Sequence, residues 1–130
     1  MNQFSLVAVC IVGLAPALLM AGGRQTSTYS GSADYQTFCG SCHGSSGKGD
    51  GVIAASLRKR PADLTQLTKK NDGVYPTDSV VKILNEGHEK EGMPAWAAVF
   101  AKSQESEGPD AAKERIREIV TYLETLQEKR

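Results

Sequence analysis

The sequence has no excess of charge of either sign, because its 130 residues include 15 Lys and Arg and 15 Asp and Glu. A nucleic-acid-binding protein needs a basic surface that neutralises phosphates, so this balance argues against that class. The one basic cluster, at residues 58–60, has acidic residues nearby and is interpreted as a solvated surface rather than a phosphate site. The length favours a single domain.

The sequence also lacks any run of alternating apolar and polar residues long enough for a β-sheet. Apolar residues recur instead at helical spacing, most clearly in a stripe near the C-terminus: Ile116, Ile119, Val120, Leu123 and Leu126. Shorter helices are expected after Ser32 as a cap, after Thr77 or Asp78 as a cap with Gly87 as the stop, and at 95–102. Glycine makes 44–51 a loop. The predicted fold class is all-α, with long loops that need something flat and apolar to wrap around.

Lys, Arg, Asp and Glu are absent from residues 1–23, and residues 4–21 are almost entirely apolar. This pattern predicts a signal peptide cleaved after Ala21-Gly22-Gly23, or an uncleaved N-terminal membrane anchor. In either case the domain at residues 24–130 is expected to be exported.

Cysteine and histidine are scarce, with 3 and 2 copies, yet three of them form the C-x-x-C-H motif Cys39-Gly40-Ser41-Cys42-His43. This motif is the signature of covalent haem attachment, because two thiols at this spacing reach both vinyl groups of a porphyrin and the imidazole then reaches the iron. A thioredoxin-like redox disulfide would need βαβ units, and none is visible. Zinc usually takes four ligands, and only Cys10 and His88 remain to supply them.

Met93 is the leading candidate for a second iron ligand, because it lies in a Gly92-Met93-Pro94 loop rather than in a helical stripe. The alternative is a methionine that only fills a gap in the core. His88 is a rival ligand, although its acidic neighbours suggest an exposed histidine; these neighbours are Glu86, Glu89 and Glu91. An open iron site is the third possibility.

At this point the chain resembles class I cytochromes c. In that family a glycine and an aromatic residue before the first haem cysteine pack on an aromatic–leucine pair of the last helix, and Gly31, Tyr35 and Tyr122-Leu123 match them. The segments 61–65 (PADLT) and 83–96, which ends in GMPAW, match the family as well.

The resemblance implies a cytochrome c fold around one covalent haem c, with Cys39 and Cys42 as thioether attachments, His43 as proximal ligand and Met93 as distal ligand. Trp96 could approach the haem or a propionate, but a buried tryptophan is equally often a plain core residue, so Trp96 is left out of the site.

The implied function is a one-electron carrier, not an enzyme, that serves redox protein donors and acceptors in the periplasm. Docking is expected through a weak interface of below about 1,200 Å². The alternative is a membrane-tethered or complex-bound subunit of a larger oxidoreductase, with membrane contact only if residues 4–21 are retained. A haem enzyme or gas sensor would need an open iron position and a distal acid or base.

Overall fold

The computed structural model describes residues 27–103 and 110–128, which form helices and loops without a strand. The all-α prediction is therefore confirmed. The α-helices are α1 (Gly31–Asp34), α2 (Gly40–His43), α3 (Leu67–Lys70), α4 (Thr77–Glu86), α5 (Trp96–Ser103) and α6 (Asp110–Thr125). The shorter elements are a π-helical turn, η1 (Tyr35–Cys39), and the 3₁₀ turns η2 (Ala54–Ser56), η3 (Leu64–Gln66) and η4 (Glu89–Glu91).

The first helix runs without a break from α1 through η1 to α2. Its cap is Ser30, whose backbone is extended and whose hydroxyl accepts a hydrogen bond from the Ala33 N–H at 3.3 Å. The expectation that Ser32 caps the helix is wrong, because Ser32 already lies inside α1. The helix ends at Gly44, which has a φ of 81° that favours glycine.

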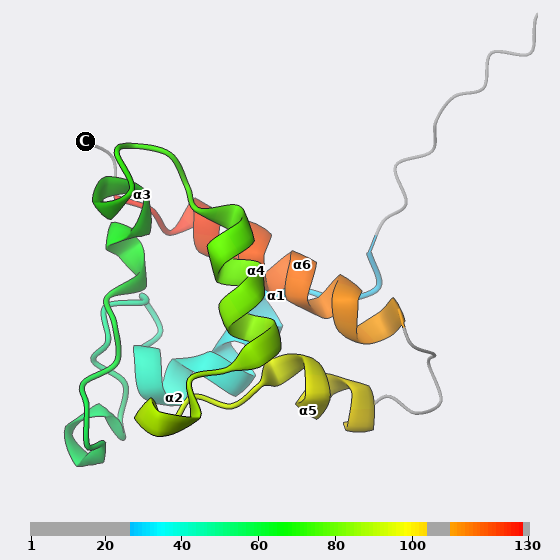
Figure 1. Ribbon diagram of the computed structural model, residues 1–130, viewed down its shortest axis with the longest axis horizontal. Coiled ribbons are helices and arrows are strands. Elements are labelled where there is room, and N and C mark those ends of the chain that lie inside the picture. Colours follow the sequence, from blue (N-terminus) through cyan, green and yellow to red (C-terminus); the bar gives the residue numbers. More distant parts are fainter. Residues whose placement is uncertain (1–26, 104–109, 129–130) are drawn as a thin grey trace, which may run out of the picture.

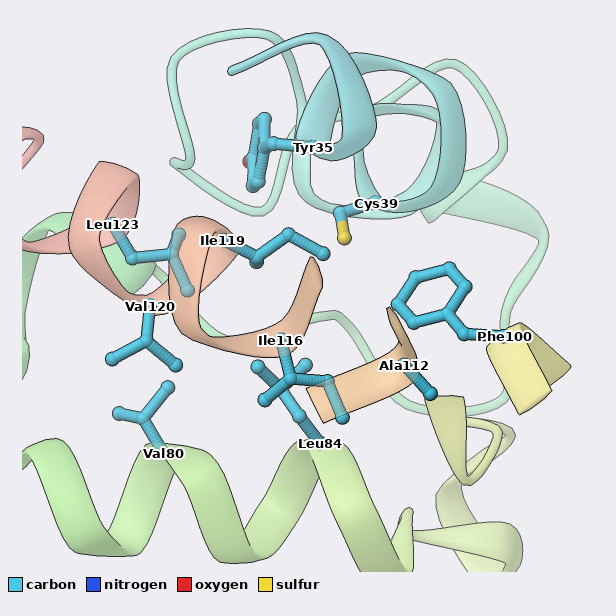
Figure 2. Close-up of a cluster of buried hydrophobic side chains, with 10 residues drawn as sticks. All are labelled: Tyr35, Cys39, Val80, Leu84, Phe100, Ala112, Ile116, Ile119, Val120 and Leu123. Carbon is cyan, nitrogen blue, oxygen red and sulfur yellow. The ribbon is translucent and has the colours of Figure 1, made fainter. Parts of the chain in front are cut away.

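Helix α6 crosses α1, and α4 and α5 pack against α6 (Figure 1). The side chains between these helices form the core shown in Figure 2: Tyr35, Cys39, Val80, Leu84, Phe100, Ala112, Ile116, Ile119, Val120 and Leu123. The Tyr35 ring lies 5.4 Å from the Tyr122 ring, and its hydroxyl donates to the Gly44 carbonyl at 2.7 Å. The predicted apolar stripe of α6 is thus confirmed as the central wall of the core.

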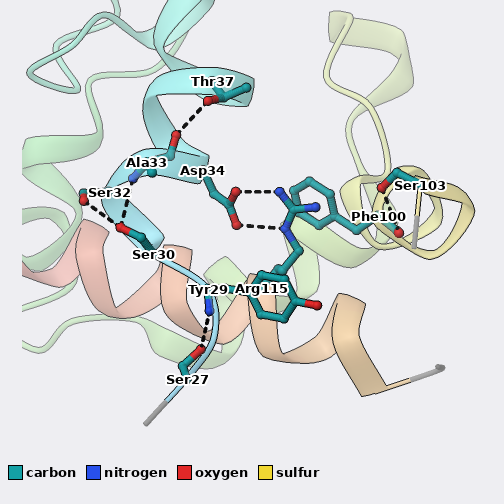
Figure 3. Close-up of polar contacts among 10 residues, drawn as sticks. All are labelled: Ser27, Tyr29, Ser30, Ser32, Ala33, Asp34, Thr37, Phe100, Ser103 and Arg115. Atoms are coloured by element: carbon teal, nitrogen blue, oxygen red, sulfur yellow. Dashed lines mark hydrogen bonds and ion pairs between the residues drawn. The ribbon is translucent and has the colours of Figure 1, made fainter. Parts of the chain in front are cut away.

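An ion pair reinforces the crossing of the first and last helices. The Arg115 guanidinium donates two hydrogen bonds to the Asp34 carboxylate, at 2.8 and 2.5 Å (Figure 3). The same guanidinium lies 4.4 Å from the centre of the Phe100 ring and 5.1 Å from that of Phe38. Both charged side chains are largely buried, so the pair ties α1 to α6 inside an aromatic shell.

The loops between α2 and α3 form the end of the molecule that lies away from α5 (Figure 1). Tyr75, in the turn before α4, donates to the Val120 carbonyl at 3.1 Å and so fastens this turn to α6. None of the helices within the described ranges combines the length and the apolar content that crossing a bilayer requires. The predicted signal peptide or anchor at 1–23 lies outside the described residues.

Candidate functional site

A cavity of about 320 Å³ opens between α2, the loop before α3, α4 and the loop before α5. All four residues predicted for the site line it: Cys39, Cys42, His43 and Met93. Most of the remaining wall is apolar and comes from segments spread along the chain, as illustrated by Phe38, Leu64, Leu67, Val80, Leu84 and Leu123. Residues far apart in the sequence therefore meet around one space.

His43 is oriented by a backbone carbonyl. Its Nδ1 lies 3.1 Å from the Ala62 carbonyl oxygen and donates to it in the matching tautomer, which leaves Nε2 with a lone pair. Burial lowers the pKa of His43, while the bond to Ala62 opposes this shift, and the neutral ring is the form that binds metals. The sequence analysis missed Ala62, although the match to segment 61–65 pointed to its neighbourhood.

The glycine-rich loop holds this carbonyl in place. The N–H groups of Gly49, Gly51 and Ile53 donate to carbonyls at the end of α2, at 2.8, 3.1 and 3.1 Å. Gly49 has a φ of 72°, and a Cβ there would collide with the Pro61 carbonyl. The loop is thus packed between α2 and the segment that carries Ala62, as its glycine content allows.

The two cysteines lie in different surroundings. Cys39 is buried and Cys42 is half-buried, and both are free thiols in the structure. Burial, with a smaller effect from the Asp34 charge, raises the pKa of Cys39 to about 12. A redox-active or nucleophilic cysteine needs a lowered pKa, so this environment argues against thioredoxin-like chemistry. The described residues contain no group of three or more His, Cys, Asp or Glu suited to a metal ion.

Met93 is half-buried in a compact loop, which we call the Met93 loop (residues 87–94). The His88 N–H donates to the Met93 carbonyl at 2.8 Å, and the Met93 N–H donates back to the His88 carbonyl at 3.1 Å. Gly87 has a φ of 70°, and a Cβ there would press on the backbone of Pro94. His88, the rival ligand, also lines the cavity while its side chain is 49% exposed, so its position alone does not decide between the two.

Charged side chains lie along the rim. Lys59 and Arg60 line the cavity on one side and Glu91 on another, and the Lys59 ammonium lies 2.5 Å from a Glu91 carboxylate oxygen. This hydrogen bond from Lys59 lowers the pKa of Glu91. The interpretation of residues 58–60 as a merely solvated surface is therefore incomplete. Trp96 packs on Phe38 and Phe100 as a core residue, but it lines the cavity as well.

This combination of groups fits a haem. The apolar walls suit a porphyrin, the two thiols suit its vinyl groups, and an imidazole nitrogen and a thioether sulfur are both known ligands of haem iron. The Arg60 guanidinium at the rim suits a carboxylate group of the porphyrin.

Comparison with known proteins agrees with this fit. The family model described as cytochrome c oxidase, cbb3-type, subunit III matches residues 27–123. A search of curated proteins and a search of solved structures each gave no match. The match covers most of the chain and confirms both the resemblance to c-type cytochromes and haem c as the cofactor. The chain therefore belongs to the family described as cytochrome c oxidase, cbb3-type, subunit III, and is a mono-haem c-type cytochrome.

Proposed function

We propose that this chain passes single electrons between redox proteins, with haem c attached through Cys39 and Cys42 and its iron bound by His43 and Met93. The observation that carries the proposal is the single cavity whose walls hold all four side chains. Family membership supports haem-based electron transfer in general, and the ligand set is our addition to it.

When bound, the haem supplies an iron centre that gains and loses one electron. The chain's own residues set the conditions for this exchange. The hydrogen bond to the Ala62 carbonyl holds the neutral His43 ring in the tautomer whose Nε2 is free to bind the iron. The apolar walls of the cavity exclude water from the bound haem. The soft thioether of Met93 favours the reduced state relative to a second imidazole, so we expect an oxidising couple. His43 and Met93 would together hold the iron and would leave it no position for a substrate, which favours a carrier over an enzyme.

The setting that we propose is the periplasm, reached through the predicted signal segment at 1–23, because c-type cytochromes are generally exported. The second candidate is a subunit of an oxidase complex, which the description of the matching family favours. The intact mass of the mature protein separates the two. A chain that begins at Arg24 supports the diffusing carrier, whereas a chain that still begins at Met1 supports the tethered subunit.

Two measurements test the ligand set. Treatment with acidified acetone should leave the colour on the wild-type polypeptide and extract it from the Cys39→Ala/Cys42→Ala double variant. The ferric protein should show the weak far-red absorption band of methionine sulfur on iron, which Met93→Ala should abolish. His88→Ala, from the same loop, is the matched control and should keep the band. A band lost with His88→Ala and kept with Met93→Ala would refute the proposed ligand.

A further inference from the structure

Two oppositely charged segments face each other at the rim of the cavity. Residues 58–60 are all basic, whereas the Met93 loop and the residue before it contain three glutamates and one lysine. Lys59 from the first segment and Glu91 from the second meet at 2.5 Å across a sequence separation of 32 residues. The ion pair therefore joins the segment just before Ala62, which lines one side of the cavity, to the Met93 loop on the other side.

Backbone hydrogen bonds connect Glu91 to Met93 within the Met93 loop. His88 and Met93 exchange two backbone hydrogen bonds, and the Glu91 N–H donates to the same His88 carbonyl at 2.9 Å. Glu91 thus lies inside a small ring of hydrogen bonds that Met93 closes. A displacement of Glu91 away from Lys59 would carry Met93 with it, because both residues are tied to one carbonyl.

We propose that Lys59 is a positioning residue that, through Glu91, holds the Met93 loop on the cavity and so opposes the replacement of Met93 by an external ligand. The inference rests on the proposed role of Met93 as an iron ligand and adds a residue outside the haem-binding motif. The Lys59 and Glu91 side chains are 63% and 44% exposed, so solvent screens the pair. Exposed ion pairs stabilise a structure much less than buried pairs do. We therefore expect loss of the Lys59–Glu91 pair to shift the equilibrium for opening of the Met93 loop by about two- to fivefold.

The test is a titration of the ferric holoprotein with imidazole at low ionic strength, followed by the loss of the far-red band. Lys59→Met should bind imidazole about two- to fivefold more tightly than the wild type. Arg58→Met is the matched control, because it removes the same charge from the same segment and leaves the Lys59–Glu91 pair intact. Lys59→Arg, and the charge swap Lys59→Glu/Glu91→Lys, should restore the wild-type affinity. High salt should narrow the difference between Lys59→Met and the wild type.

Equal imidazole affinities for Lys59→Met and the wild type would overturn the inference. It would also be overturned if Arg58→Met bound imidazole as tightly as Lys59→Met does, or if the charge swap did not restore the wild-type affinity. These outcomes leave the proposed ligand set untouched, provided that the wild type shows the far-red band. A wild type without the band would refute the role of Met93 itself, and the positioning role with it. The two failures are therefore distinguishable in one experiment.

Discussion

Gly31 marks the point where α1 crosses α6. A Cβ built there would collide with the Glu118 carbonyl and lie 3.1 Å from the Ile119 nitrogen. Both are backbone atoms of α6, which cannot rotate away as the end of a side chain can. The two helices would have to separate, and with them the contact that the Asp34–Arg115 pair reinforces.

We expect Gly31→Ala to lower the free energy of unfolding of the holoprotein by about 1–3 kcal/mol, measured by urea denaturation. Gly40→Ala is the control in the same helix, because its Cβ would meet the side-chain oxygen of Gln36 at 3.3 Å and would lie at an ordinary contact distance of 3.7 Å from the Tyr35 carbonyl oxygen. Alanine also favours helix over glycine, so the control should cost little or nothing. A larger loss for Gly40→Ala than for Gly31→Ala would contradict this account of the crossing.

Single residues also mark the limit of what the sequence could predict. Cys39, Cys42 and His43 were recognised because a covalent cofactor imposes a fixed spacing on adjacent residues. Ala62 was missed because it acts through a backbone carbonyl, which leaves no trace in the identity of its side chain. Lys59 was interpreted as solvated because its contact with Glu91 is set by the paths of two loops, which no local sequence pattern reveals.

Among the structural elements, the turn before α4 depends on Tyr75, which is bonded to α6 through the Val120 carbonyl. Burial, with a smaller effect from Glu124, raises the pKa of Tyr75 from 10.0 to about 12. The unfolded chain therefore loses the phenol proton at a lower pH than the folded chain does. The stabilisation by Tyr75 is fully present below about pH 10 and is lost as the pH rises towards 12.

We expect Tyr75→Phe to be less stable than the wild type at pH 8, by about 1 kcal/mol for the lost hydrogen bond. The difference should shrink as the pH rises from 10 to 12, because phenylalanine has no proton to lose. Urea denaturation of both proteins across this range is the measurement. A difference that stays constant with pH would mean that ionisation of Tyr75 is not coupled to unfolding.

Elements with a strong pattern were predicted well. The stripe of α6 and the glycine after α4 predicted both helices, because amphipathic spacing and a left-handed stop are local signals. The expected cap of α4 at Thr77 or Asp78 is wrong, because the cap is Pro76 and both residues lie inside the helix. The first helix was predicted less well. Its cap lies at Ser30 rather than Ser32, and the π-helical turn at Tyr35–Cys39 was not foreseen, because a spacing of apolar residues does not distinguish a local π-turn from an α-helix.

At the scale of the whole molecule, the cavity is large for so small a domain. Its volume is about 320 Å³, and core residues of η1, α4 and α6 contribute to its walls: Tyr35, Val80, Leu84 and Leu123. Without the haem, these apolar side chains would face water instead of an apolar partner. The haem is thus expected to act as part of the core as well as a redox centre.

We therefore expect the Cys39→Ala/Cys42→Ala chain, freed of pigment, to lose its fixed tertiary packing. Near-ultraviolet circular dichroism should weaken, and limited proteolysis should cut the chain far faster than it cuts the holoprotein. The wild type carried through the same extraction and refolding, with its haem still attached, is the control. A pigment-free chain that unfolds cooperatively at the wild-type midpoint would show that the polypeptide needs no haem to complete its core.

The pairing of Asp34 with Arg115 spans 81 positions, so α1 and α6 can pack together only when nearly all of the described chain is present. Leu123 of α6 also lines the cavity that holds Cys39, Cys42, His43 and Met93. A chain that ends before α6 would therefore lack both the partner of the first helix and one wall of the cavity.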